Sequence, residues 1–235
     1  MAGPRSRTLL ERIADSGQDH SNSAFPYLAA GAFSVLGGVR GRLYRLSFSG
    51  ELAYEVAVPA QHGEALIEAL FTAGEDLGVT PYGTETLGVL RIEKGHPAGG
   101  ELSGQTTAHD LGLGRLLSRN KDYIGAVLAQ RTALTDAARP RLVGIKPADR
   151  EERLYSGAHF IKTDAPATAA HDEGYVTSVA FSPALGHWIG LGLLARGPER
   201  HGEHLRACDP LRGRETRVEV CDPVFVDPEG GRLRG

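Results

Sequence analysis

Six short apolar segments in the second half of the chain place the strongest constraint on the fold. Each has the length and the apolar pattern of a strand, and Gly, Pro, Asp and Ser residues separate one segment from the next. Repeated short strands with turn residues between them predict a small β-barrel or β-sandwich. The six segments are residues 142–146, 159–162, 175–181, 188–195, 204–207 and 216–220.

The first half of the chain mixes helical and strand patterns, and residues 3–15 predict a short helix. Between the two halves, residues 135–141 read TDAARPR, which is typical of a linker. We therefore expect an α+β domain over residues 1–137 and a β-barrel domain over residues 138–235.

Residues 43–95 organise the first half. The alternation over 42–49 predicts a half-buried strand, and the alternation over 54–58 predicts a second strand paired with it as a hairpin. The turn between them is Ser49-Gly50-Glu51. On the first strand we expect one apolar face and one polar face, made respectively by Tyr44, Leu46 and Phe48 and by Arg45, Ser47 and Ser49.

Two helices are predicted after this hairpin. The first runs from about residue 60 to 77 and stops at Gly78, a residue suited to a helix C-terminus. Its expected apolar face consists of Ile67, Leu70, Phe71 and Leu77. The second begins at Thr84 and covers residues 85–94, with Arg91 on the same side as Leu87. A helix of residues 125–134 is also predicted.

Glu51 and Arg91 are the candidate binding residues. A carboxylate fixed at a turn can accept two adjacent N–H groups of a heterocycle, such as a pterin or guanine edge. The alternative for Glu51 is a solvated turn carboxylate. The planar fork of Arg91 could meet a ligand carboxylate or carbonyl, or could pair with Glu93 or Glu55.

Composition and motifs exclude several other classes. The net charge of -3 and the scattered arginines give no support to nucleic-acid binding, and no apolar run is long enough to span a membrane, so we expect a cytoplasmic protein. The two cysteines have no metal or disulfide spacing. The pair His201 and His204 lacks the further ligands that a metal site needs. No GxSxG motif of a serine hydrolase is present. The nearest match to a dinucleotide-binding motif, GLGLLA at 190–195, lies in a predicted strand with no helix after it. We therefore expect no metal site and no catalytic constellation.

Five motifs then make the chain similar to a known family. In order they are LSFSGELAYEVAVP, PYGTETLGVLRIEKGH, AHDLGLGRLLSRNKDYIG, GYVTSVAFSPALGHWIGLGLL and CDPVFVDPEGGRL. Their order and spacing resemble the C-terminal region of sarcosine oxidase α subunits, a branch of the aminomethyltransferase (glycine cleavage T protein) family. The resemblance covers nearly the whole chain and implies a folate-binding α+β fold followed by a β-barrel.

The resemblance also implies a ligand and a reaction. In this family the Gly-Glu of the hairpin turn supplies a carboxylate to the pterin ring of tetrahydrofolate, which places that role on Glu51. Arg91 lies in the segment resembling the family's RLEAG motif, and Tyr54 and Tyr82 are further candidates to line the site. The implied role is capture of the one-carbon unit from oxidised sarcosine, with FAD, FMN and NAD held by partner chains.

Departures from the family pattern leave the activity open. The family's long dinucleotide-binding region and catalytic aspartate region have no counterpart in these residues, so other subunits or a separate N-terminal half are expected as partners. An arginine of the aminomethyltransferases aligns with Leu87, which favours the oxidase branch. The alternatives are a non-catalytic assembly module that keeps the fold, or a stand-alone folate-dependent aminomethyltransferase or demethylase.

Overall fold

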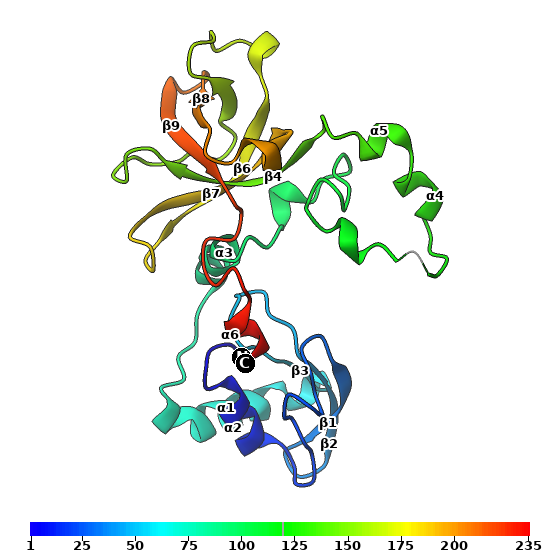
Figure 1. Cartoon of the computed structure of the whole chain (residues 1–235). Helices are drawn as coiled ribbons and strands as arrows, with labels where there is room; N and C mark the ends of the chain where they lie inside the picture. Colours follow the sequence, from blue (N-terminus) through cyan, green and yellow to red (C-terminus); the bar gives the residue numbers. More distant parts are fainter. Residues whose placement is uncertain (119) are drawn as a thin grey trace. The chain divides into compact units, whose positions relative to one another are not determined.

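The computed structural model describes residues 1–118 and 120–235, which form two compact units (Figure 1). Unit 1 consists of Met1–Leu90 together with Val226–Gly235, and unit 2 is Arg91–Phe225. Each unit is described by itself below.

The elements of unit 1 are α1 (Ser6–Ile13), β1 (Ala30–Val35), β2 (Val39–Tyr44), β3 (Glu55–Ala57), η1 (Ala60–His62), α2 (Gly63–Gly74), η2 (Glu75–Leu77) and α6 (Gly231–Arg234). Helix α3 (Thr84–Glu93) leads into unit 2. The elements of unit 2 are η3 (Gly99–Glu101), η4 (Gly114–Leu116), α4 (Ala126–Ala129), α5 (Thr132–Thr135), β4 (Pro140–Pro147), β5 (His159–Lys162), η5 (Ala169–His171), β6 (Gly174–Ser182), β7 (His187–Ala195), η6 (Gly197–Arg200), β8 (His204–Asp209) and β9 (Arg214–Cys221).

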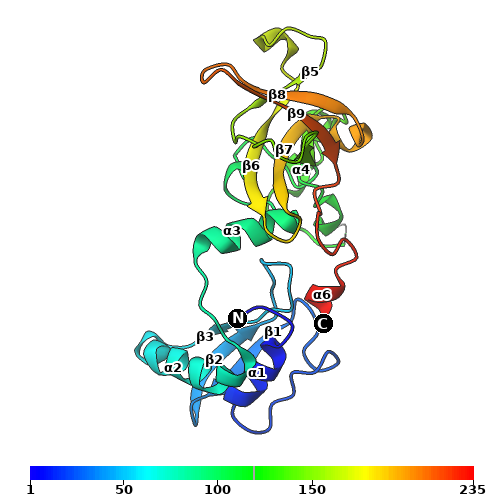
Figure 2. The ribbon, with the colours of Figure 1, turned by 90° about the vertical axis from the view of Figure 1, so that its left-hand side faces the viewer.

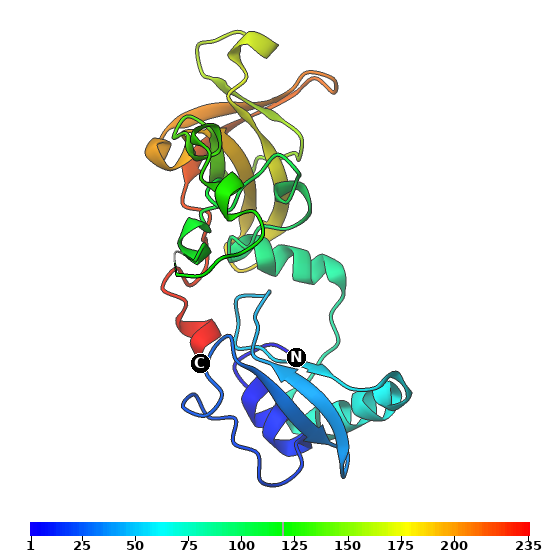
Figure 3. The same ribbon diagram turned by 90° about the vertical axis from the view of Figure 1, so that its right-hand side faces the viewer.

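Unit 1 is a three-stranded antiparallel sheet covered on one face by helices. The strand order is β1-β2-β3, and α1 and α2 lie together against the sheet (Figures 2 and 3). Apolar side chains of both helices and of β1 and β2 share one core, which explains why this small sheet is stable with a solvated second face. The core contains Leu10, Ile13, Phe33, Val35, Leu43, Leu52, Tyr54 and Leu66.

The predicted hairpin pairing is confirmed, but the predicted faces after Tyr44 are wrong. Strands β2 and β3 pair with Tyr44 opposite Glu55, and residues 45–54 form a connection longer than a tight turn. In this connection Arg45 is buried, whereas Leu46 and Phe48 are exposed. The cause is hydrogen bonding to distant backbone, because the Arg45 guanidinium donates to the carbonyl oxygens of Phe25 and Arg234.

The predicted helix of residues 60–77 exists with a different inward face. It begins with the 3₁₀ turn η1 and continues as α2 and η2, and Gly78 follows with a left-handed φ of +68°, in keeping with its predicted place at the helix C-terminus. Leu66 is buried, while Ile67 and Phe71 are exposed. Leu66 shares its face with Leu70 at i+4, and both pack into the core, so the helix is rotated by about one residue from the expected orientation.

Unit 2 contains a closed barrel with the strand order β4-β7-β6-β5-β8-β9. All six predicted strands are confirmed, and every neighbouring pair is antiparallel. The GLGLLA run lies in β7, as expected. There a Cβ on Gly192 would lie 2.6 Å from Cζ of Phe160, so this glycine serves core packing. The barrel core contains Val143, Ile145, Leu154, Phe160, Val176, Leu194, Leu205, Val218 and Val220.

The predicted helix of residues 125–134 is divided into α4 and α5. Arg131 separates them in an extended conformation, with φ of -61° and ψ of 136°. Each piece is a single helical turn of four residues. None of the helices in the described parts of the chain is both long enough and apolar enough to cross a bilayer.

Candidate functional site

Glu51 sits in the connection between β2 and β3, where hydroxyl groups fix the backbone. Gly50 has a left-handed φ of +84°, which a residue with a side chain rarely adopts. The Ser47 Oγ donates to the Glu51 carbonyl oxygen at 2.5 Å, and the Glu51 N–H points to the Ser49 Oγ at 3.4 Å. Ser47 and Ser49 are buried by this arrangement, so the turn is held from inside.

The Glu51 carboxylate is bound on one oxygen and open on the other. Its Oε1 accepts a hydrogen bond from Arg232 Nη1 at 3.0 Å, in an ion pair whose side chains are 27% exposed for Glu51 and 57% exposed for Arg232. Within residues 1–118 and 120–235, no hydrogen bond to Oε2 is present. The carboxylate therefore keeps acceptor capacity for a donor that arrives from solvent.

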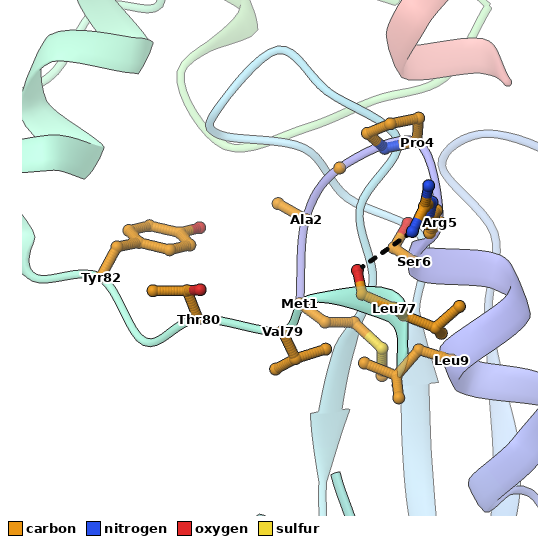
Figure 4. Close-up of a pocket in the computed structure, with 11 residues that line it drawn as sticks. Met1, Ala2, Pro4, Arg5, Ser6, Leu9, Leu77, Val79, Thr80 and Tyr82 are labelled. Atoms are coloured by element: carbon orange, nitrogen blue, oxygen red, sulfur yellow. Dashed lines mark hydrogen bonds between the residues drawn. The ribbon is translucent and has the colours of Figure 1, made fainter. Parts of the chain in front are cut away.

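The two tyrosines predicted near the site occupy different environments. Tyr54 is fully buried in the core of unit 1, and its hydroxyl accepts a hydrogen bond from Arg7 Nε at 3.0 Å. Tyr82 is 48% exposed and lies beside Thr80 at the edge of a cavity of about 290 Å³ (Figure 4). Residues from α1 and from the segment before it form the opposite side of that cavity, which is mainly apolar.

Arg91 lies in a buried polar network of unit 2. Its Nη1 donates to Glu101 Oε2 at 3.0 Å and to the His96 carbonyl oxygen at 3.3 Å, and its Nη2 donates to Ser178 Oγ at 2.7 Å. The Arg91 side chain is 12% exposed and the Glu101 side chain is completely buried. Arg91 thus ties the end of α3 to strand β6, and its carboxylate partner is neither Glu93 nor Glu55.

Glu101 is the centre of this network, and the sequence reasoning missed it. Its Oε1 accepts hydrogen bonds from Thr177 Oγ1 at 2.5 Å and Ser178 Oγ at 2.6 Å, and its Oε2 also accepts the Ala98 N–H at 2.9 Å. Burial alone would raise the pKa of Glu101. The hydrogen bonds from Ser178, Thr177 and Ala98, together with the charge of Arg91, outweigh burial and lower that pKa.

A second bond between α3 and the barrel lies close to this network. Ser182, at the end of β6, donates through Oγ to Glu93 Oε1 at 2.5 Å, and both side chains are buried. In the sequence, Glu93 and Glu101 appear only as charged residues beside a glycine-rich stretch. This pattern does not identify their hydroxyl partners on β6, which lie more than 70 positions further along the chain.

Unit 2 also holds a second buried carboxylate. Asp110, in the HDLGLG stretch, is buried and paired with Arg139 at 2.7 Å. The two cysteines are poor nucleophiles, because burial raises the pKa of Cys208 to about 11 and that of Cys221 to about 12. Among the residues that the structure describes, no group of three or more His, Cys, Asp and Glu side chains could hold a metal ion.

Comparisons with known proteins match both halves of the chain. Residues 1–121 match the family described as the GCVT N-terminal domain, and residues 141–227 match the glycine cleavage T-protein C-terminal barrel domain. A solved structure of glycine cleavage system aminomethyltransferase T from Bartonella henselae superposes with a TM-score of 0.72 at 22% identity, covering 88% of this chain and 55% of that one. The aminomethyltransferase-type fold with its barrel is thereby shown.

Curated relatives are similar over the full chain. A sarcosine oxidase subunit alpha from Rhizobium meliloti (strain 1021) is 48% identical over 99% of this chain, and one from Corynebacterium sp. (strain U-96) is 40% identical over 100%. An aminomethyltransferase from Streptomyces coelicolor is 32% identical over 87% of this chain and 54% of its own length. The chain spans 24% of the length of each of the two sarcosine oxidase subunits.

Proposed function

The chain belongs to the glycine cleavage T protein family, and we propose that it is the tetrahydrofolate-binding module of a sarcosine-oxidase-like enzyme. The proposed module captures the one-carbon unit released by oxidative demethylation of sarcosine. Similarity over the full chain to relatives named sarcosine oxidase subunit alpha supports this assignment. FAD or FMN and NAD would then be held by partner chains.

The observation that carries the proposal is the state of the Glu51 carboxylate. Its backbone is fixed by Ser47 and Ser49, and one carboxylate oxygen lacks a hydrogen bond among the described residues. Adjacent N–H donors on a pterin ring suit a carboxylate, which offers only acceptors. The residues present therefore fit the group, and Glu51 would hold the pterin while Arg232 keeps the carboxylate oriented.

Arg91 has a different place in the proposal. Its guanidinium donates to Glu101, Ser178 and the His96 carbonyl, so we assign it a positioning role that fixes the end of α3. Tyr82, exposed at the rim of a mainly apolar cavity, is the tyrosine available for contact with a ligand. Tyr54 would support the site only by its packing in the core of unit 1, because its ring is fully buried.

Calorimetric titration of the full chain with tetrahydrofolate tests the role of Glu51. We expect Glu51→Ala to weaken binding by more than tenfold, about 1.4 kcal/mol, because the acceptor for the pterin N–H groups is lost. Glu51→Gln should lose most of the same affinity, since an amide offers one acceptor and no charge. Glu68→Ala, which removes an exposed carboxylate of α2, is the matched control. An unchanged affinity in Glu51→Ala would refute the proposal.

A non-catalytic assembly module that keeps the fold is the second candidate. Folate titration of the chain alone and mixed with the products of neighbouring genes separates the two. Binding only in the mixture indicates a split enzyme, and absence of binding in both favours assembly. A stand-alone aminomethyltransferase or demethylase would show turnover by the chain alone.

The domain boundary near residue 137 and the cytoplasmic location stay predictions.

A further inference from the structure

Two arginines lie over two aromatic rings at one end of the barrel in unit 2. The Arg153 guanidinium lies 4.8 Å from the centre of the Trp188 ring and 5.5 Å from that of Tyr155. The Arg214 guanidinium lies 4.5 Å from the same Tyr155 ring. Phe181, 47% exposed, packs edge-on against Trp188 at 6.2 Å. We call these five residues the arginine–aromatic patch.

The topology of the barrel brings the members of the patch together. Strands β6 and β8 both run antiparallel to β5, so both end at the same end of the barrel. The hairpins β6–β7 and β8–β9 therefore turn at that end, and they supply Trp188 and Arg214. The connection from β4 to β5 crosses there too and supplies Arg153, whose carbonyl oxygen accepts a hydrogen bond from Thr216 Oγ1 at 2.9 Å.

The charges of the patch are only partly balanced by the chain. Both Arg153 and Arg214 are exposed, and in the described residues neither forms an ion pair with a carboxylate. Asp209 lies opposite Arg214 in the β8–β9 ladder and interacts with its charge, but its ion pair is with Arg212, and Glu215 pairs with Arg206. Two like charges that share one ring repel each other, and an incoming anion would relieve this repulsion. Contact with a ring also restricts the motion of each guanidinium, which lowers the entropy lost on bidentate binding of a carboxylate.

We propose that the arginine–aromatic patch is a docking surface for a carboxylate-rich segment of a partner protein. Arginine and aromatic side chains are enriched at the centres of protein interfaces, and exposed Phe181 and Leu211 add apolar contact area at the same end of the barrel. The chain's net charge of -3 disfavours a nucleic acid as the occupant, because phosphate backbones bind to extended basic surfaces. The proposal does not depend on folate binding.

Trp188 provides a direct measurement, because it is the single tryptophan of the chain. Titrating the full chain with an alternating Glu-Ala peptide at low salt should change Trp188 fluorescence and saturate, whereas the matching Gln-Ala peptide should not. The double variant Arg153→Gln with Arg214→Gln should weaken peptide binding by more than about tenfold. The double Lys variant should recover only part of that loss, since lysine keeps the charge and not the stacked plane.

The matched control is Arg40→Gln with Arg42→Gln, which removes two exposed arginines from β2 of unit 1. We expect this control to bind the peptide within about twofold of the unmodified chain. Thermal unfolding of all variants identifies any that do not fold, and the unfolded ones are replaced by the single variants.

Equal weakening in the control, or no saturation with the Glu-Ala peptide, overturns the proposal. Tighter binding of single-stranded DNA than of the peptide, lost in the patch variant, would assign the surface to nucleic acid instead. Folate affinity should be unchanged in the patch variant. Failure of the docking proposal would therefore leave the proposed role of Glu51 unaffected.

Discussion

The surroundings of Glu51 and of Arg91 differ in how completely the protein uses their hydrogen-bonding capacity. Arg91 has a fully buried carboxylate, a hydroxyl and a carbonyl as acceptors. Glu51 has one exposed arginine on one oxygen, and its second oxygen is open in the described chain. A charge with a saturated set of partners stabilises the fold, whereas a charge with spare capacity on a rigid turn can bind a ligand.

This difference separates two residues that the sequence alone treats as equivalent. Both are charged residues placed near glycines in a segment with one apolar side. Arg91 and Glu51 differ in burial and in the number of their hydrogen-bond partners. Substitutions in the Glu101–Arg91 network should therefore lower the free energy of unfolding more than substitutions of the Glu51 side chain.

Removing the carboxylate at the centre of the network should have the largest effect. Glu101→Ala leaves the Arg91 charge without its buried partner, and we expect the free energy of unfolding to fall by roughly 3–5 kcal/mol. Urea denaturation of the full chain measures the change. The control is Glu219→Ala, which breaks the partly exposed pair with Lys146 and should cost less than about 1 kcal/mol. Similar losses in both variants would show that the network is not special.

The pH dependence of stability should reveal the same carboxylate. The folded-state pKa of Glu101 lies below its ordinary value of 4.5 because its hydrogen bonds and Arg91 outweigh burial. Its contribution to stability is therefore present above pH 4.5 and is lost as the pH falls through the lower folded-state pKa. The comparison is made between the unmodified chain and Glu101→Gln by urea denaturation at a series of pH values. We expect the difference in unfolding free energy to shrink in acid, and a constant difference would contradict this account.

Glu51→Ala should change stability least. The pair with Arg232 is partly exposed, and the Ser47 and Ser49 bonds that hold the turn involve the Glu51 backbone, which the substitution keeps. We expect the free energy of unfolding to change by less than about 1 kcal/mol, in contrast with the expected tenfold loss of folate affinity. A loss as large as that of Glu101→Ala would place Glu51 among the structural residues and remove the distinction drawn above.

The barrel could be predicted from sequence because its strands are short, apolar and punctuated by turn residues. The sequence does not predict strand β1, since AGAFSV contains small residues that give little periodic signal. The faces after Tyr44 were wrong because Arg45 is buried by carbonyl acceptors 20 and 189 positions away. Glu101 was missed for a similar reason, because its hydroxyl partners lie 76 and 77 positions further along the chain. Pairings of this range leave no local pattern.

Unit 1 is discontinuous in sequence, and this has a consequence for synthesis of the protein. Residues 1–90 are made before unit 2, but Val226–Gly235 belong to unit 1 and are made after it. The Arg232 partner of Glu51 and one of the two carbonyl acceptors of Arg45 lie in this second segment of unit 1. On the ribosome, unit 2 can therefore complete its local contacts first. At that stage unit 1 still lacks the hydrogen bonds that residues 226–235 make to the connection between β2 and β3. The Glu51 carboxylate therefore acquires its Arg232 partner only after unit 2 has been made.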